Sequence, residues 1–133
     1  MPKRLLAKAK FNVDIYSTTI IVIVMANSKL VTSKVKELCK LHNADTVGLP
    51  NECYGYTISF HEKTRVYYVL YSAVNLTYNT VTHEAHHLSK FIADFNNIKE
   101  KEYAEAEAFL NGYINDRIFK ILNTAAIPLS YEQ

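Results

Sequence analysis

Apolar positions in the first third of the chain change from a strand pattern to a helix pattern. The segment from Phe11 to Met25 is rich in Val, Ile and Thr, and it contains an unbroken apolar run from Ile20 to Ala26. This composition predicts one long β-strand or a bent pair. Downstream of Ser28, which is placed to act as an N-cap, apolar residues recur every three or four positions and predict a helix over 29–42.

The middle of the chain has the pattern of a β-hairpin. Residues 54–61 alternate between apolar and polar positions, and residues 65–72 are more continuously apolar. Only 62–64 separate the two runs, so a short turn is expected to join two antiparallel strands.

Helical periodicity dominates the last third. We predict one helix from about Val81 to Phe95, capped by Asn79 or Thr80, and a second over about 99–122. Pro128 ends the helical pattern, and the tail 129–133 is expected to be loose. Strands come first and paired helices last, which predicts an α+β fold in a single domain spanning 1–133.

Length, charge, hydropathy and cysteine content indicate what kind of protein the chain forms. Its 133 residues suffice for one hydrophobic core, and the net charge of +2 does not favour a nucleic-acid partner. The longest apolar run is too short to cross a bilayer, so no membrane partner is expected. Two cysteines, Cys39 and Cys53, form neither a metal-ligand pattern nor a disulfide framework, and we expect a cytoplasmic protein.

The string His83-Glu84-Ala85-His86-His87 carries the candidate chemistry. Four residues of a helix turn the chain by about 400°, so His83 and His87 lie on one face, about 6 Å apart along the axis. Two imidazoles placed in this way can bind one zinc ion. Glu84 is offset by about 100° and can take a proton from a metal-bound water without binding the metal.

The alternative for this string is a pair of ordinary core histidines with a paired glutamate. Helical projection places His83, Glu84 and His87 on the side of the helix that carries the large residues Leu88, Phe91 and Phe95. Burial of three such polar groups would be costly without a metal, which favours the metal site. His86 projects away from that side and is expected at the surface.

A catalytic zinc site needs a third protein ligand, and the second helix offers Glu105 and Glu107. The large apolar residues of that helix lie nearer Glu107. A row of small residues, Ala104, Ala108 and Gly112, would permit close helix approach and borders Glu105. The pattern alone leaves the two glutamates open.

Residues 80–118 resemble the zincin-type metallopeptidases, and in particular the short metallopeptidases encoded by bacteriophages. In that family the active helix is followed by a helix reading Asp-Glu-Ala-x-Ala-Tyr-Leu-x-Gly-Tyr/Trp, and residues 104–113 read Ala-Glu-Ala-Glu-Ala-Phe-Leu-Asn-Gly-Tyr. The match aligns Glu105 with the family's glutamate. Ala104 departs from the pattern, because the family commonly has an aspartate there.

The resemblance implies a small zincin-like domain with one zinc ion bound by His83, His87 and Glu105. It further implies peptide-bond hydrolysis with Glu84 as general base, a peptide or protein substrate, and the host-cell cytoplasm as the location. The hairpin would then hold an extended substrate at its edge. A zincin fold that binds metal or a partner without catalysis is the alternative.

Overall fold

The computed structural model describes residues 4–46, 48–60, 65–98 and 100–131. Within them the order of elements is β1 (Leu5–Val13), the 3₁₀ turn η1 (Asp14–Tyr16), β2 (Thr18–Met25), α1 (Ser28–Leu41), β3 (Gly55–Ser59), β4 (Val66–Ser72), α2 (Tyr78–Phe95) and α3 (Glu100–Thr124). The fold is α+β, as predicted.

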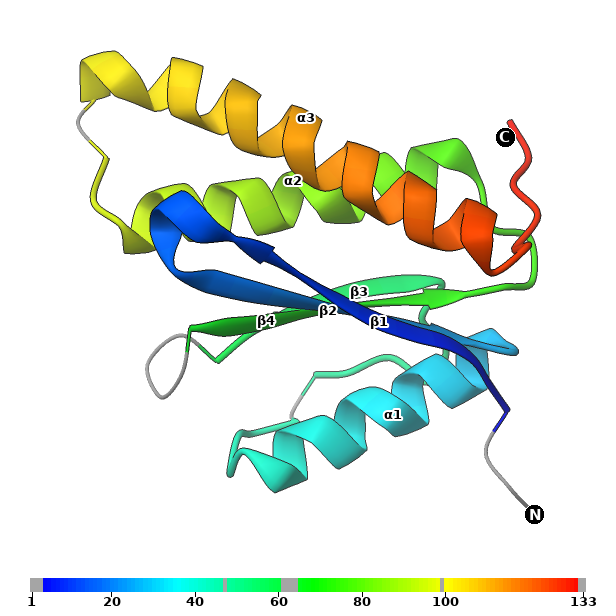
Figure 1. Ribbon diagram of the computed structural model, residues 1–133. Helices are drawn as coiled ribbons and strands as arrows, with labels where there is room; N and C mark the ends of the chain where they lie inside the picture. The colour runs from blue at the N-terminus through cyan, green and yellow to red at the C-terminus, as the bar shows by residue number, and fades with distance from the viewer. Residues whose placement is uncertain (1–3, 47, 61–64, 99, 132–133) are drawn as a thin grey trace.

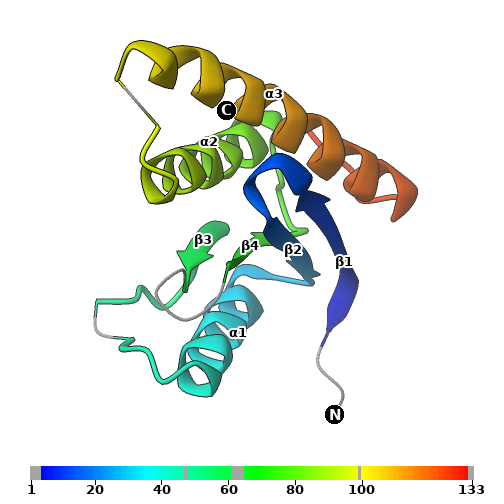
Figure 2. The same ribbon diagram turned by 60° about the vertical axis from the view of Figure 1, so that its left-hand side comes forward.

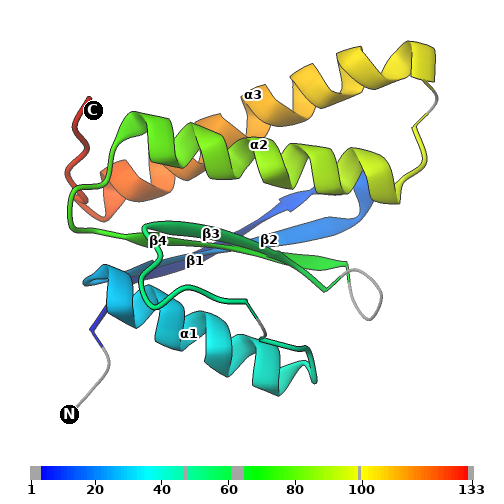
Figure 3. The ribbon, with the colours of Figure 1, turned by 180° about the vertical axis from the view of Figure 1, so that it is seen from behind.

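The four strands form one mixed sheet in the order β1-β2-β4-β3. The central pair β2–β4 is parallel, and the outer pairs β1–β2 and β3–β4 are antiparallel. The helices α2 and α3 cover one face of the sheet, and α1 covers the other (Figure 1, Figure 3). The strands β1 and β3 are therefore the two edges of the sheet, which Figure 2 shows at opposite sides.

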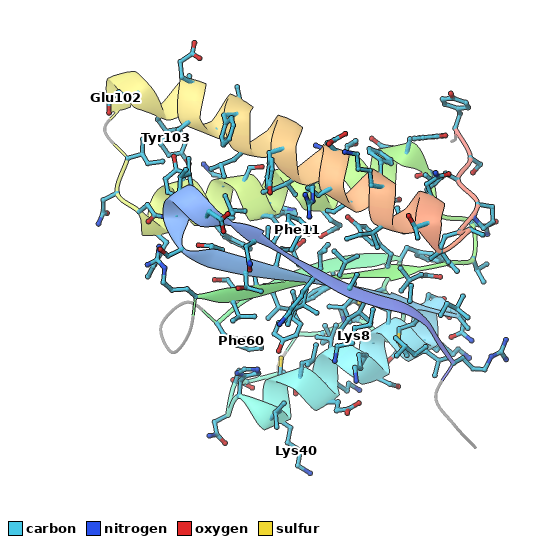
Figure 4. All side chains as sticks on the ribbon, in the orientation of Figure 1. Lys8, Phe11, Lys40, Phe60, Glu102 and Tyr103 are labelled. Carbon is cyan, nitrogen blue, oxygen red and sulfur yellow. The ribbon has the colours of Figure 1, made fainter. Side chains whose placement is uncertain are left out.

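Each face of the sheet has its own hydrophobic core. Val22 and Val69 belong to the core beneath α2 and α3, and Ile23 and Leu70 belong to the core beneath α1; all four are fully buried. This arrangement explains the unbroken apolar run in β2, because a central strand covered on both faces has few solvent-facing positions. Phe11 and Phe60 mark the two cores on opposite sides of the sheet (Figure 4).

The N-terminal segment is the bent pair rather than one strand, and it begins earlier than predicted. Strand β1 starts at Leu5 and pairs with β2 in a register that sets Phe11 opposite Ile20. Its first half alternates alanine with exposed lysine (Ala7, Lys8, Ala9, Lys10), which is an edge-strand composition with few large apolar residues. The apolar pattern therefore predicted only the part of β1 from Phe11 onwards.

The predicted helices and hairpin are present, with different capping residues. Asn27 caps α1, since its side chain accepts a hydrogen bond from the Leu30 amide at 3.0 Å, and Ser28 is already helical. Thr77 caps α2 in the same way through the Thr80 amide at 3.0 Å, so Asn79 and Thr80 are not the cap. Strands β3 and β4 pair as predicted, whereas the expected turn at 62–64 lies outside the described residues.

The C-terminal tail is attached rather than loose over its described part. The Ser130 amide donates to the Leu76 carbonyl, and the Tyr78 amide donates to the Ser130 carbonyl, both at 3.0 Å. These bonds hold the tail beside the first turn of α2. Residues 132–133 lie outside the described residues.

Both thiols are free and buried. The Cys53 amide donates to the Ser28 carbonyl at the start of α1, whereas Cys39 lies near the other end of that helix. The two thiols therefore lie towards opposite ends of α1, and no disulfide joins them. Among the described residues, no helix is both long and apolar enough to cross a membrane.

Candidate metal centre

The first half of α2 brings the two predicted histidine ligands together. The Nε2 atoms of His83 and His87 lie 3.2 Å apart, and the rings are nearly perpendicular at 87°. Two nitrogens bound to one tetrahedral zinc at about 2.0–2.1 Å would be about 3.3 Å apart. The imidazole pair therefore fits a zinc ion with little adjustment.

The pair lies on the solvent side of α2, which corrects the predicted orientation. His83 is exposed and His87 is half-buried, whereas Val81, Ala85 and Leu88 face the sheet and are fully buried. The large residues Phe91 and Phe95, which the projection used to define the buried side, are only half-buried. The side of α2 that faces the sheet is therefore not the side that carries the histidines. His86 is exposed, as predicted.

Glu84 is the buried member of the motif, with only 8% of its surface exposed. The Thr57 hydroxyl on β3 lies 2.6 Å from the Glu84 Oε1 atom and 3.2 Å from the Glu84 carbonyl oxygen, and it donates to the carboxylate over the shorter distance. A hydrogen bond to a carboxylate fixes its orientation and is stronger than a neutral one. The edge strand thus fixes the orientation of the candidate base.

Gly55 explains how β3 approaches α2 so closely. A Cβ atom at this position would lie 2.9 Å from the Glu84 Cγ atom and 3.0 Å from the Thr80 Cγ2 atom. Those distances are shorter than van der Waals contact, so glycine leaves space that the Glu84 side chain occupies. Neither Gly55 nor Thr57 was singled out from the sequence, although a glycine inside a strand pattern is a recognised sign of close approach.

Two phenols lie in the electrostatic field of Glu84. Burial, followed by the Glu84 charge, raises the pKa of Tyr71 well above its usual value, and its hydroxyl donates to the Val81 carbonyl at 3.1 Å. Burial also raises the pKa of Tyr56, with smaller contributions from both cysteines and Glu84. Both tyrosines therefore stay neutral around pH 7 and add no negative charge beside Glu84.

The two glutamates of α3 face different ways. Glu105 is exposed, and no cluster of three or more potential metal ligands is formed by the residues that the structure describes. Glu107 faces α2, where its Oε2 atom lies 3.6 Å from the His86 Nε2 atom rather than near the histidine pair. The structure therefore brings together His83 and His87, holds the adjacent Glu84 against β3, and leaves Glu105 exposed and apart from the pair.

The core packing of α3 determines this orientation. Ile114 lies about 180° around the helix from Glu105. The residues at this inward side, Leu110, Ile114, Ile118 and Leu122, are all fully buried. The small residues Ala104, Ala108 and Gly112 are exposed, and nothing lies within 4 Å of a Cβ atom placed on Gly112. The row therefore does not bring α3 close to the neighbouring helix, although its small side chains would permit it.

No protein-family model, curated protein or solved structure matches the chain.

Proposed function

We propose that the protein is a zinc-dependent peptidase in which His83 and His87 bind the metal and Glu84 is the general base. The separation of 3.2 Å between the two Nε2 atoms is the observation that carries the proposal. The two nitrogens are joined there by a hydrogen bond between the imidazoles, and the same separation suits two nitrogen ligands of one tetrahedral zinc ion.

The chain's own groups are arranged for proton transfer. Zinc, when bound, lowers the pKa of a coordinated water towards neutrality. Glu84 is fixed by the Thr57 hydroxyl at its Oε1 atom, which leaves the Oε2 atom to accept a proton from water. Its low exposure keeps competing solvent away and strengthens its electrostatic interactions.

The position of Glu84 favours a peptide as the substrate. Strand β3 is an edge of the sheet, and its residues Gly55 and Thr57 lie against Glu84. An extended peptide that pairs with this edge through main-chain hydrogen bonds would run beside the general base. The buried free thiols are consistent with a reducing compartment, and we place the protein in the cytoplasm, that of the host cell if a bacteriophage encodes it.

Metal analysis of four purified proteins tests the proposal: the wild type, His83→Ala, Glu84→Gln and the control His86→Ala. The wild type, Glu84→Gln and His86→Ala should retain zinc and lose thermal stability when a chelator removes it. His83→Ala should lose the metal, because one ligand alone binds weakly. Absence of zinc from the wild type after reconstitution would overturn the metal site.

A peptidase assay separates catalysis from metal binding alone. Cleavage of an unstructured protein substrate by the zinc-loaded wild type should fall by at least two orders of magnitude in Glu84→Gln, since the base is removed while the metal stays. Zinc binding without cleavage in either protein would instead support a zincin fold that binds metal without catalysis.

A further inference from the structure

The outer edge of β1 carries backbone groups that point away from the sheet. The Thr19 amide donates to the Arg65 carbonyl on the β4 side of β2, at 3.0 Å, so it does not bond to its partner Asn12 on β1. The pair is therefore one of the non-hydrogen-bonded pairs of the β1–β2 ladder. The Asn12 carbonyl accepts instead from the Tyr113 hydroxyl of α3, on the outer side of β1, at 3.0 Å.

The same argument applies to Lys8 and Lys10. Hydrogen-bonded and non-hydrogen-bonded pairs alternate along an antiparallel ladder, and these lysines precede Asn12 in steps of two residues. Their amide and carbonyl groups therefore also point away from β2, at the edge of the sheet that β1 forms (Figure 2). Tyr113 closes this edge at Asn12, which leaves the stretch around Ala9 for a further strand.

A cavity of about 540 Å³ lies beside this stretch, between β1 and the C-terminal half of α3. Ala7 and Ala9 line it from the strand, and Ile121 and Ala125 line it from the opposite side. Because the two alanines have small side chains, the apolar side chains of an added strand have room in this cavity.

The two faces of β1 differ in character. Ala7 packs against the core beneath α2 and α3, and Ala9 shares its face by alternation. Lys8 and Lys10 point to the other face, where they are exposed and line a smaller hollow with Ile21. The edge thus combines an apolar cavity on one face with two cations on the other.

The cavity side of the edge is basic. Arg117 and Lys120 of α3 also line the cavity. Asp116 lies 3.3 Å from the Lys120 ammonium and offsets its charge. The Arg117 guanidinium lies over the Phe11 ring, 5.5 Å from its centroid, and a ring contact leaves its charge in place. One positive charge is therefore in excess among these three charged groups.

The other face is basic as well. Strand β1 contains Lys8 and Lys10 and no acidic residue. On α1, which covers that face of the sheet, Glu37 pairs with Lys34 at 3.5 Å, so the two charges cancel. The exposed Asp14 follows the strand, beyond the closed end of the edge. An acidic segment is therefore attracted to both faces of the edge.

We propose that the free edge of β1 binds an extended acidic segment of another protein by strand addition. The added strand hydrogen-bonds to the outward groups of Lys8 and Lys10. Its side chains alternate between the two faces, so that acidic residues lie beside the two lysines and apolar residues enter the cavity. The site is at the opposite edge of the sheet from β3, and it is independent of the proposed metal centre.

A second copy of the chain is a poor occupant of this edge. Antiparallel pairing of β1 with β1 of another copy sets Lys8 and Lys10 against the same lysines on the same face, and like charges placed opposite each other are destabilising. Lysine on an edge strand disfavours such self-association. The same charges favour a segment of opposite sign.

A short synthetic peptide in which glutamate and valine alternate tests the proposal. Fluorescence anisotropy of the labelled peptide should show saturable binding to the wild type. A peptide of the same composition, rearranged to break the alternation, should bind at least about tenfold more weakly, because it cannot place its acids on one face and its valines on the other. A peptide in which lysine replaces glutamate should not bind.

Charge reversal should invert this preference. The double variant Lys8→Glu/Lys10→Glu should lose affinity for the glutamate peptide and gain affinity for the lysine peptide, each by at least about tenfold. The matched control Lys36→Glu/Lys40→Glu changes the net charge equally at exposed positions of α1 and should keep the wild-type preference. Because all four lysines are exposed, thermal unfolding should differ little among the three proteins.

Amide hydrogen exchange locates the added strand. In the free protein the Lys10 amide points outward and should exchange fast, whereas the Ala9 amide faces β2 and should be protected. The glutamate peptide should slow exchange at Lys8 and Lys10 and leave the amides of β3 unchanged.

Three results would each overturn the inference. Equal binding of the alternating and rearranged peptides would reduce the contact to charge attraction. Slowed exchange on β3 instead of at Lys10 would place the peptide at the other edge. A wild-type dimer whose Lys10 amide is protected without peptide would assign the edge of β1 to a second copy.

Discussion

The hydroxyl of Thr57 on β3 donates a 2.6 Å hydrogen bond to the carboxylate of Glu84 on α2. This contact joins the edge of the sheet to the helix that carries the histidine pair. Because Glu84 is almost completely buried, it has few other partners that could replace the hydroxyl. Edge strand and candidate base are therefore coupled: movement of one displaces the other.

Replacing Thr57 with valine should weaken both folding and catalysis. The change keeps the shape but leaves a buried carboxylate without its donor, so the free energy of unfolding should fall by about 1.5–3 kcal/mol in chemical denaturation. Thr57→Ser, which keeps the hydroxyl, should lose less than half as much. A loss in Thr57→Ser that exceeds the loss in Thr57→Val would show that the methyl group contributes more to stability than the hydrogen bond does.

Substitution of alanine should have opposite effects at two of the glycines. At Gly55 the new Cβ atom meets the Glu84 and Thr80 side chains at 2.9 and 3.0 Å, so we expect a loss of about 1–3 kcal/mol and reduced activity. At Gly112, on the exposed side of α3, it meets nothing within 4 Å, and a gain of about 0.5–1 kcal/mol is expected. Thermal unfolding of the two variants without metal measures both changes in stability. Destabilisation by Gly112→Ala would contradict the exposed position of that residue.

Alkaline pH should reveal the hydrogen bond between Tyr103 and Asp94. This bond raises the pKa of Tyr103 to about 12, from 10.0 in the unfolded chain. A raised pKa means that the folded state holds the proton more tightly, so the stabilisation is present below about pH 10 and is lost as the pH rises towards 12. The difference in unfolding free energy between the wild type and Tyr103→Phe should shrink over that window. A difference that stays constant would exclude this linkage.

Metal-free stability should distinguish the two sides of α3. Ile114→Ala creates a cavity in the core and should cost about 2–5 kcal/mol. Glu105→Ala removes an exposed side chain on the opposite side of the helix and should stay within about 0.5 kcal/mol of the wild type. Urea denaturation measures both. A large loss in Glu105→Ala would mean that its side chain is packed within the monomer.

Elements with a strong apolar period were predictable from the sequence, and those without one were not. The three helices have regular patterns because one side of each faces a core, whereas β4 is continuously apolar because it faces a core on both sides. The first half of β1 lay outside the predicted strand, because its alternating alanines and lysines, such as Ala7 and Lys8, suit an edge that has little to bury. The caps were misplaced by one to three residues, since several adjacent polar residues can each act as an N-cap.

At the site, local spacing was informative and long-range packing was not. The convergence of His83 and His87 follows from helix geometry alone, and the structure has it. The contact of Glu84 with Thr57 depends on how β3 packs on α2, which no local pattern encodes. The row of small residues on α3 was ambiguous, because alanine and glycine suit both a close helix contact and a bare surface. The role of Glu105 as a ligand stays a prediction.

The bonds that join Ser130 to Leu76 and Tyr78 make the chain terminus part of one cooperative unit with the first turn of α2. Hydrogen exchange at the Tyr78 and Ser130 amides should therefore report a single opening event, not the independent fraying of a tail and a helix end. A fusion partner attached after the last residue is therefore expected to make this opening more frequent. It would loosen the turn that precedes the histidine pair, whereas the same partner at the other end of the chain would meet an exposed sheet edge.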